Sequence, residues 1–219
     1  MTTILNAIPF FVNEHDGNQC QQVCARTALQ VAGKPDISLA DLDRLSGRLP
    51  NQWTFTQQIV GALLEKEVAL RYYSSTALEP FLRGKEFILA QYGADAAHIV
   101  SKVNCEALVE ATKKILLTRS FEQRVLQPDE IEKFLADGNC VIITIDYNTL
   151  TGKKGPYQGH TIVLTGYDHD NFYYHENGPR NPKPHVAVQK NALLGAWRHP
   201  ATDCDAVVIF KNNAIKHTP

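Results

Sequence analysis

Long apolar runs are absent from this sequence. No stretch approaches the ~18 consecutive apolar residues that a membrane-spanning helix needs. Residues 1–10 also lack the basic segment that opens a secretory signal peptide. The net charge is only −1, so no strong field of one sign favours nucleic acid or an anionic membrane as a partner. We therefore expect a cytoplasmic protein with neither kind of partner.

Cysteine is scarce, and its five copies stand at irregular spacing: Cys20, Cys24, Cys105, Cys140 and Cys204. An odd number without a regular pattern argues against a disulfide framework and for a reducing compartment. Cys20 and Cys24 are the only close pair, and no second cysteine pair or spaced histidine pair completes a set of four zinc ligands. We expect no disulfide, no metal and no cofactor.

What the chain does have is a change of hydrophobic period along its 219 residues. Helical spacing dominates the first part and strand-like runs dominate the last part, which is typical of an α+β fold with an antiparallel sheet. We expect a single domain over 1–219, with 77–119 as a helical insertion broken near Gly84 and Gly93. The predicted helices are 20–33, 38–45, 54–67, 128–136 and 191–197, and the predicted strands are 68–73, 140–147, 161–167, 172–175 and 206–210.

Cys20 is the first chemical candidate because it opens a predicted helix. The turn-forming segment Asp16-Gly17-Asn18 stands just before it. The dipole and free N–H groups of a helix start favour a thiolate, which is the nucleophilic form of cysteine. Cys24 lies one turn later and is the alternative nucleophile. The remaining reading is that both are small buried apolar residues.

His160 is the second candidate, since it follows Gly159 and opens a clean strand pattern. A third residue is expected to orient the imidazole through its other nitrogen. Glu176 and Asn177 both fit, because a strand, a tight turn and a return strand bring their position back beside His160. The sequence does not choose between them.

Several short motifs in this order resemble those of papain-like cysteine peptidases, and most of all the bacteriocin-processing peptidases that cleave double-glycine leaders. The similarity is greatest to a stand-alone prokaryotic branch of that group and covers about residues 8–211. The matching residues are Asn13, Asp16-Gly17, Gln19-Cys20, Gln22, Trp53-Thr54, Gly159-His160, Gly166-Tyr167-Asp168 and Ala196-Trp197. The resemblance implies a papain-like fold in which the nucleophile helix packs on the C-terminal sheet.

The resemblance also implies site residues. Its nucleophile falls on Cys20, its base on His160, and its acid on the position of Glu176 and Asn177, where the group normally has an Asp-Pro pair. The glutamine that normally helps to hold the oxyanion is replaced here by Glu14. An ionised carboxylate cannot donate a hydrogen bond, so Asn13 or Gln19 is expected to supply the side-chain donor.

These parts predict a cysteine-dependent hydrolase, a peptidase or amidase, that acts on a peptide or on a small amide or thioester through an acyl-thioester intermediate. Two alternatives remain. An acyltransferase or transamidase would use the same residues with an amine acceptor, and a papain-like binding protein would have lost catalysis. The sequence does not indicate the oligomeric state or the substrate.

Overall fold

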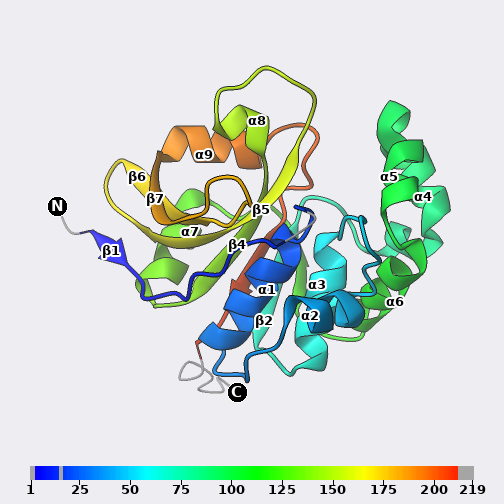
Figure 1. Cartoon of the computed structure of the whole chain (residues 1–219), viewed down its shortest axis with the longest axis horizontal. Coiled ribbons are helices and arrows are strands. Elements are labelled where there is room, and N and C mark those ends of the chain that lie inside the picture. The colour runs from blue at the N-terminus through cyan, green and yellow to red at the C-terminus, as the bar shows by residue number, and fades with distance from the viewer. Residues whose placement is uncertain (1–2, 15–16, 212–219) are drawn as a thin grey trace.

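The computed structural model describes residues 3–14 and 17–211. Within those ranges the strands form one sheet in the order β3-β2-β8-β4-β5-β6-β7, and β1 pairs with β5 off this path (Figure 1). All neighbours are antiparallel except β2 and β3, which run parallel. The strands are β1 Ile4–Leu5, β2 Leu70–Ser74, β3 Phe121–Gln123, β4 Cys140–Asp146, β5 Gly159–Tyr167, β6 Asn171–Glu176, β7 Lys183–Gln189 and β8 Ala206–Ile209.

The helices flank this sheet and extend beyond one side of it (Figure 1). The α-helices are α1 Cys20–Val31, α2 Leu39–Ser46, α3 Thr56–Glu65, α4 Lys85–Gln91, α5 Ala96–Lys102, α6 Cys105–Leu116, α7 Pro128–Ala136, α8 Tyr147–Leu150 and α9 Lys190–Trp197. Two 3-10 helices, η1 Glu79–Arg83 and η2 Gly93–Asp95, connect them. None of the helices in the described part of the chain is long and apolar enough to cross a bilayer.

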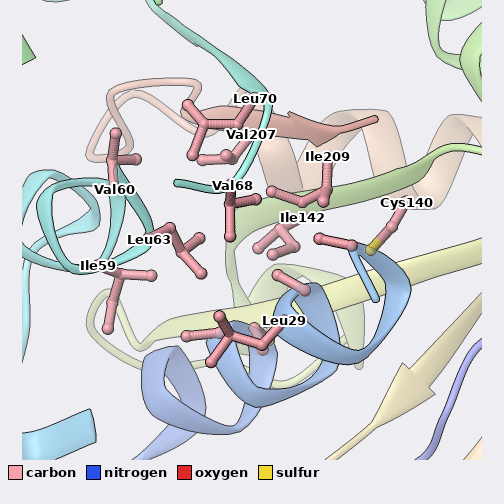
Figure 2. Close-up of a cluster of buried hydrophobic side chains, with 14 of the residues drawn as sticks. Leu29, Ile59, Val60, Leu63, Val68, Leu70, Cys140, Ile142, Val207 and Ile209 are labelled. Atoms are coloured by element: carbon pink, nitrogen blue, oxygen red, sulfur yellow. The ribbon is translucent and has the colours of Figure 1, made fainter. Parts of the chain in front are cut away.

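Strand β4 has apolar side chains on both faces, which places it between two helical layers. Ile142 belongs to a cluster with α1 and α3, which Figure 2 shows in part. Its neighbours Val141 and Ile143 belong to a second cluster with α7 and α9. Because successive residues of a strand point to opposite faces, the mostly apolar run of residues 140–145 is typical of a strand that is buried on both faces.

Helix α1 is held against the first of these faces. Val23, Ala28 and Leu29 are buried in the cluster that includes Val163 of β5, and α1 packs directly on that strand. The helix ends at Val31, Ala32 caps it, and Gly33 follows with a φ of 67°, a left-handed conformation that suits glycine at a helix end. The start of α1 is thereby fixed relative to β5.

Between β2 and β3 the chain is helical, as η1, α4, η2, α5 and α6, with breaks at Gly84 and Gly93. This helical segment has its own small apolar cluster of Phe81, Phe87, Ile88 and Leu108. Helix α6 joins this unit to the rest of the protein by packing on α3, and α4 and α5 lie farther from the sheet (Figure 1).

The predicted helices and strands agree with the structure to within about two residues at most ends, but the sheet is larger than expected. Strands β1, β3 and β7 and the single-turn helix α8 were not predicted. The predicted C-terminal antiparallel sheet is confirmed for β4 to β8, and the unpredicted β3 adds one parallel pairing, with β2. Both β1 and β3 are two or three residues long and exist only through their partner strands.

Gly166 explains how the N-terminal strand reaches the sheet. It pairs with Leu5 of β1, and a Cβ atom at this position would collide with the carbonyl oxygen of Ile4. The ladder between β5 and β6 also shifts register between Leu164 and Gly166. Glycine in a strand often marks such a close backbone approach.

Replacing Leu29 tests whether the α1 cluster stabilises the fold. Leu29 is 1% exposed, so Leu29→Ala should leave a cavity and lower the free energy of unfolding by about 2–5 kcal/mol. Leu117→Ala is the matched control, because Leu117 is 88% exposed and its loss should change stability by less than about 0.5 kcal/mol. Urea unfolding followed by circular dichroism measures both. Equal effects of the two substitutions would contradict the packing described here.

Candidate active site

Cys20 is the first residue of α1 and is partly exposed. Gly17 precedes it with a φ of 73°, which turns the chain into the helix. Val23 is the first residue of α1 whose backbone amide makes a helical hydrogen bond, which it donates to the carbonyl of Gln19 at 2.9 Å. The amides of Cys20, Gln21 and Gln22 therefore stand at the positive end of the helix, where they favour a negative charge.

His160 lies beside Cys20 at the start of β5. It pairs across the sheet with Ile145 of β4, and its imidazole lies near enough to the Cys20 sulfur for each group to shift the pKa of the other. The ring of Tyr147 packs edge-on against it, with 5.2 Å between ring centroids. The structure thus brings together a residue at the start of α1 and a residue at the start of β5.

Glu176 contacts the other side of the imidazole. Its Oε1 lies 3.0 Å from Nε2 of His160 and also accepts a hydrogen bond from the amide of Gly178 at 2.9 Å. Because His175 pairs with Val163, continuing that register puts Glu176 diagonal to His160 on the same face of the sheet. The register of β6 with β7 shifts just before Glu176, as often happens where a strand must redirect a side chain.

The electrostatics of these three groups favour a thiolate and an imidazolium. Burial opposes ionisation of Cys20, but the hydrogen bond and charge of His160 outweigh it and lower the pKa of the thiol. Burial likewise opposes the imidazolium, yet the hydrogen bonds with Cys20 and Glu176 raise the pKa of His160 to about 9. Burial would raise the pKa of Glu176, but its contact with His160 lowers it. Each partner thus holds the others in charged form.

Cys24, the alternative nucleophile, lies fully buried one turn below Cys20. Its thiol donates to the carbonyl of Thr161 at 3.4 Å. Burial and the nearby charge of Cys20 raise the pKa of Cys24 well above the usual value. Cys24 therefore has the environment of an inert core thiol, whereas Cys20 has that of a reactive one.

Asn177 lies on the opposite side from Glu176, as expected for consecutive residues at a strand end. Its Nδ2 donates to the sulfur of Cys24 and to the carbonyl of Thr161, both at 3.2 Å. It contacts the helix and strand beneath the site rather than the imidazole. Between the two candidates for the third residue, the geometry favours Glu176.

The two predicted oxyanion residues are placed differently from each other. Gln19 donates its amide to Oδ2 of Asp43 at 2.9 Å, so this amide is engaged by α2. Asn13 is buried, its backbone amide donates to the carbonyl of Asn177, and its Oδ1 has no hydrogen-bond partner. Glu14 is exposed. Asp16, part of the predicted motif, lies outside the described residues together with His15.

The sequence did not indicate two residues that lie beside Cys20. The backbone amide and the hydroxyl of Thr161 lower the pKa of the Cys20 thiol, and Gln21 joins the hydroxyl groups behind Thr161. Thr161 follows His160 directly and faces α1, so strand alternation alone could have indicated it. Gln21 offered no such signal, because a glutamine inside a helix is usually a surface residue.

No set of three or more His, Cys, Asp or Glu side chains in residues 3–14 and 17–211 is arranged to hold a metal ion. The described site is thus built from a thiol, an imidazole, a carboxylate and backbone amides. Such a set can generate a nucleophile, move a proton and bind an oxyanion.

Comparison with solved structures identifies the fold. The chain is similar to a crystal structure described as a C39-like peptidase from Bacillus anthracis, with 12% identity, a TM-score of 0.55, and coverage of 96% of this chain and 98% of the other. It is also similar to the peptidase domain of Streptococcus ComA, a bifunctional ABC transporter involved in quorum sensing, with 13% identity, a TM-score of 0.49, and coverage of 91% and 96%. The first likeness confirms the predicted papain-like α+β fold of C39-like peptidases.

Comparison of the sequence with protein-family profiles matches a family whose name differs from that of the peptidases that the motifs resemble. The profile described as guanylylate cyclase matches residues 12–209. No curated protein matches the sequence significantly. On this match across nearly all of its length, the chain belongs to the guanylylate cyclase family.

Proposed function

We propose that this protein is a cysteine-dependent hydrolase that attacks amide, ester or thioester carbonyls through Cys20. The observation that supports it best is the chain of contacts from the Cys20 sulfur to His160 and from Nε2 of His160 to Glu176 at 3.0 Å. A nucleophile, a base within hydrogen-bond reach and a third group that orients the base are the arrangement that covalent catalysis requires. The fold of C39-like peptidases is compatible with a peptide or a small amide or thioester as substrate.

In the proposed reaction the Cys20 thiolate attacks the carbonyl carbon, and a C–S bond forms as the carbonyl electrons move to oxygen. The Cys20 amide at the helix start would bind that oxyanion. Asn13 is the better side-chain candidate to assist it, because the amide of Gln19 is bonded to Asp43. The C–N, C–O or C–S bond to the leaving group then breaks, and the leaving group takes a proton from the His160 imidazolium.

The acyl-thioester that remains is resolved by a second attack. Water gives its proton to His160, its oxygen bonds to the acyl carbon, and Cys20 leaves as thiolate. An amine in place of water would give acyl transfer, the alternative within the same chemistry. All five cysteines are free, and we propose that the protein works in the cytoplasm, where Cys20 stays reduced.

The family name suggests a second activity, cyclisation of GTP with release of pyrophosphate. The residues around Cys20 supply a thiolate and a geometry suited to acyl transfer. Cyclisation of GTP requires neither. A direct assay separates the two: purified protein is incubated with GTP and Mg²⁺ or Mn²⁺, and the products are separated by chromatography. Cyclic product formed equally by wild type and Cys20→Ala would contradict our proposal for the site.

Alkylation of the wild-type chain at pH 6.5 tests the state of Cys20. The lowered thiol pKa should make Cys20 react with iodoacetamide roughly tenfold faster than a free thiol of pKa about 8.5. Mass spectrometry of peptides locates the label. Cys24 and Cys140 are internal controls that should stay unlabelled, because burial raises both pKa values. The same label yield after Cys20→Ala would show that another thiol reacts.

Turnover of an activated ester tests the roles of Cys20 and His160. With p-nitrophenyl acetate, Cys20→Ala and His160→Ala should each lower kcat/KM by about 10³-fold or more, since nucleophile and base act as a unit. Cys105→Ala, at a half-buried thiol in α6, should retain wild-type turnover. Adding hydroxylamine and measuring hydroxamate shows whether an amine competes with water. Full activity in Cys20→Ala would rule out the proposed nucleophile.

The pH profile distinguishes Glu176 from Asn177 as the partner of the imidazole. The rate should rise as Cys20 ionises and fall as His160 loses its proton near pH 9. Glu176→Gln removes the carboxylate that raises the pKa of His160, so the alkaline limb should move down by about one unit. Asn177→Ala should leave that limb in place. The opposite pattern would assign the role to Asn177.

A further inference from the structure

A cluster of hydroxyl groups lies behind Cys20, at the point where α1, α3, β4 and β5 meet. The hydroxyls of Thr144 and Thr161 lie 3.1 Å apart on directly paired residues of β4 and β5. The hydroxyl of Thr56, from α3, lies 3.4 Å from that of Thr144. Gln21 donates from one amide nitrogen to both Thr56, at 3.2 Å, and Thr144, at 3.4 Å.

This cluster ends beside Cys20, where the amide and the hydroxyl of Thr161 lie near enough to the sulfur to lower the pKa of the thiol. Each hydroxyl has a single proton to donate. When the Thr161 hydroxyl donates its hydrogen bond to the thiolate, it can only act as an acceptor toward Thr144. The hydroxyl proton of Thr144 must then point toward Thr161. Thr144 then needs a donor of its own, and Gln21 supplies it.

The other end of the cluster faces a buried acid. The hydroxyl of Thr56 lies near enough to Asp205 to lower the pKa of that carboxyl, which burial and neighbouring Asp203 raise to about 7. While Asp205 is ionised, the single Thr56 proton is drawn to the carboxylate and is not available to Thr144. The two protons of the Gln21 amide can reach Thr56 and Thr144 at once. Gln21 is therefore the only group of the cluster that can donate a hydrogen bond to Thr144 both when Asp205 is ionised and when it is protonated.

We propose that Gln21 is a positioning residue for the Cys20 nucleophile, because it fixes the hydroxyls of Thr144 and Thr161 so that Thr161 donates to the sulfur. The proposal rests on the proposed thiol chemistry of Cys20. Gln21, Thr56 and Thr161 are all buried, so bulk water does not replace their hydrogen bonds. A hydrogen bond to an anion is stronger than one between neutral groups, and its loss should destabilise the thiolate.

Other groups also act on the charge of Cys20. His160 and, through it, Glu176 approach from β5 and β6. Cys24 lies below on α1, and Tyr157 lies near enough for the Cys20 charge to raise its pKa. The test therefore changes the hydroxyl cluster alone and leaves these four residues as they are.

The experiment measures the pH midpoint of Cys20 alkylation by iodoacetamide in the full chain, with mass spectrometry of the labelled peptide. Thr161→Val removes the hydroxyl and keeps the shape, so the midpoint should rise by about one pH unit. Thr161→Ser keeps a hydroxyl and should stay near wild type. Gln21→Met removes the amide donor, and we expect a smaller rise in the same direction.

Thr27→Val is the matched control on the same helix. Thr27 is buried, and its hydroxyl donates to the carbonyl of Val23 rather than to the cluster, so the midpoint should not move. Circular dichroism and Tm check that each variant folds. Should Thr161→Val fail to fold, the pair Thr161→Ala and Thr161→Ser gives the same comparison.

Three results overturn different statements. A wild-type midpoint like that of a free thiol would overturn the proposed function itself. A lowered wild-type midpoint that neither Thr161→Val nor Gln21→Met changes would overturn the hydroxyl cluster alone. A rise in Thr161→Val without one in Gln21→Met would leave Thr161 as a donor and overturn the role of Gln21.

Discussion

The contact between the Cys20 sulfur and the His160 imidazole is the interaction on which the site depends. Neither charge suits its partly buried position alone, because loss of contact with water raises the pKa of the thiol and lowers that of the imidazole. Together, and with Glu176 on the far side of the ring, each charge stabilises the next. The fold provides this by packing α1 on β5, so that a helix start and a strand start meet at one end of the sheet.

Much of the fold could be predicted from the sequence, since the elements that carry the core have strong local signals. The capping box of Ser38 and Asp41 and the apolar run of β4 are examples, and both are present. The missed elements depend on tertiary partners. Strand β3 is three residues long and exists through its pairing with β2, and β7 begins with Lys183 and Pro184, which do not favour a strand.

Prediction of the site reached its limit where strand register decides the outcome. Cys20 and His160 were found from local motifs at a helix start and a strand start. Glu176 and Asn177 could not be separated, because consecutive residues face opposite sides and the sequence does not give the register that assigns them. The direct pairing of Thr144 with Thr161, which builds the hydroxyl cluster, depends on register in the same way. Catalytic roles for these residues remain our proposal.

Nuclear magnetic resonance titration of His160 tests the central contact most directly. With histidine labelled in the ring, the imidazole of the wild-type chain should stay protonated at pH 7 and titrate near pH 9. In Cys20→Ala the thiolate is absent, so the pKa of His160 should fall toward or below the usual value of about 6.5. A wild-type pKa near 6.5 that Cys20→Ala leaves unchanged would show that sulfur and imidazole do not form the charge pair.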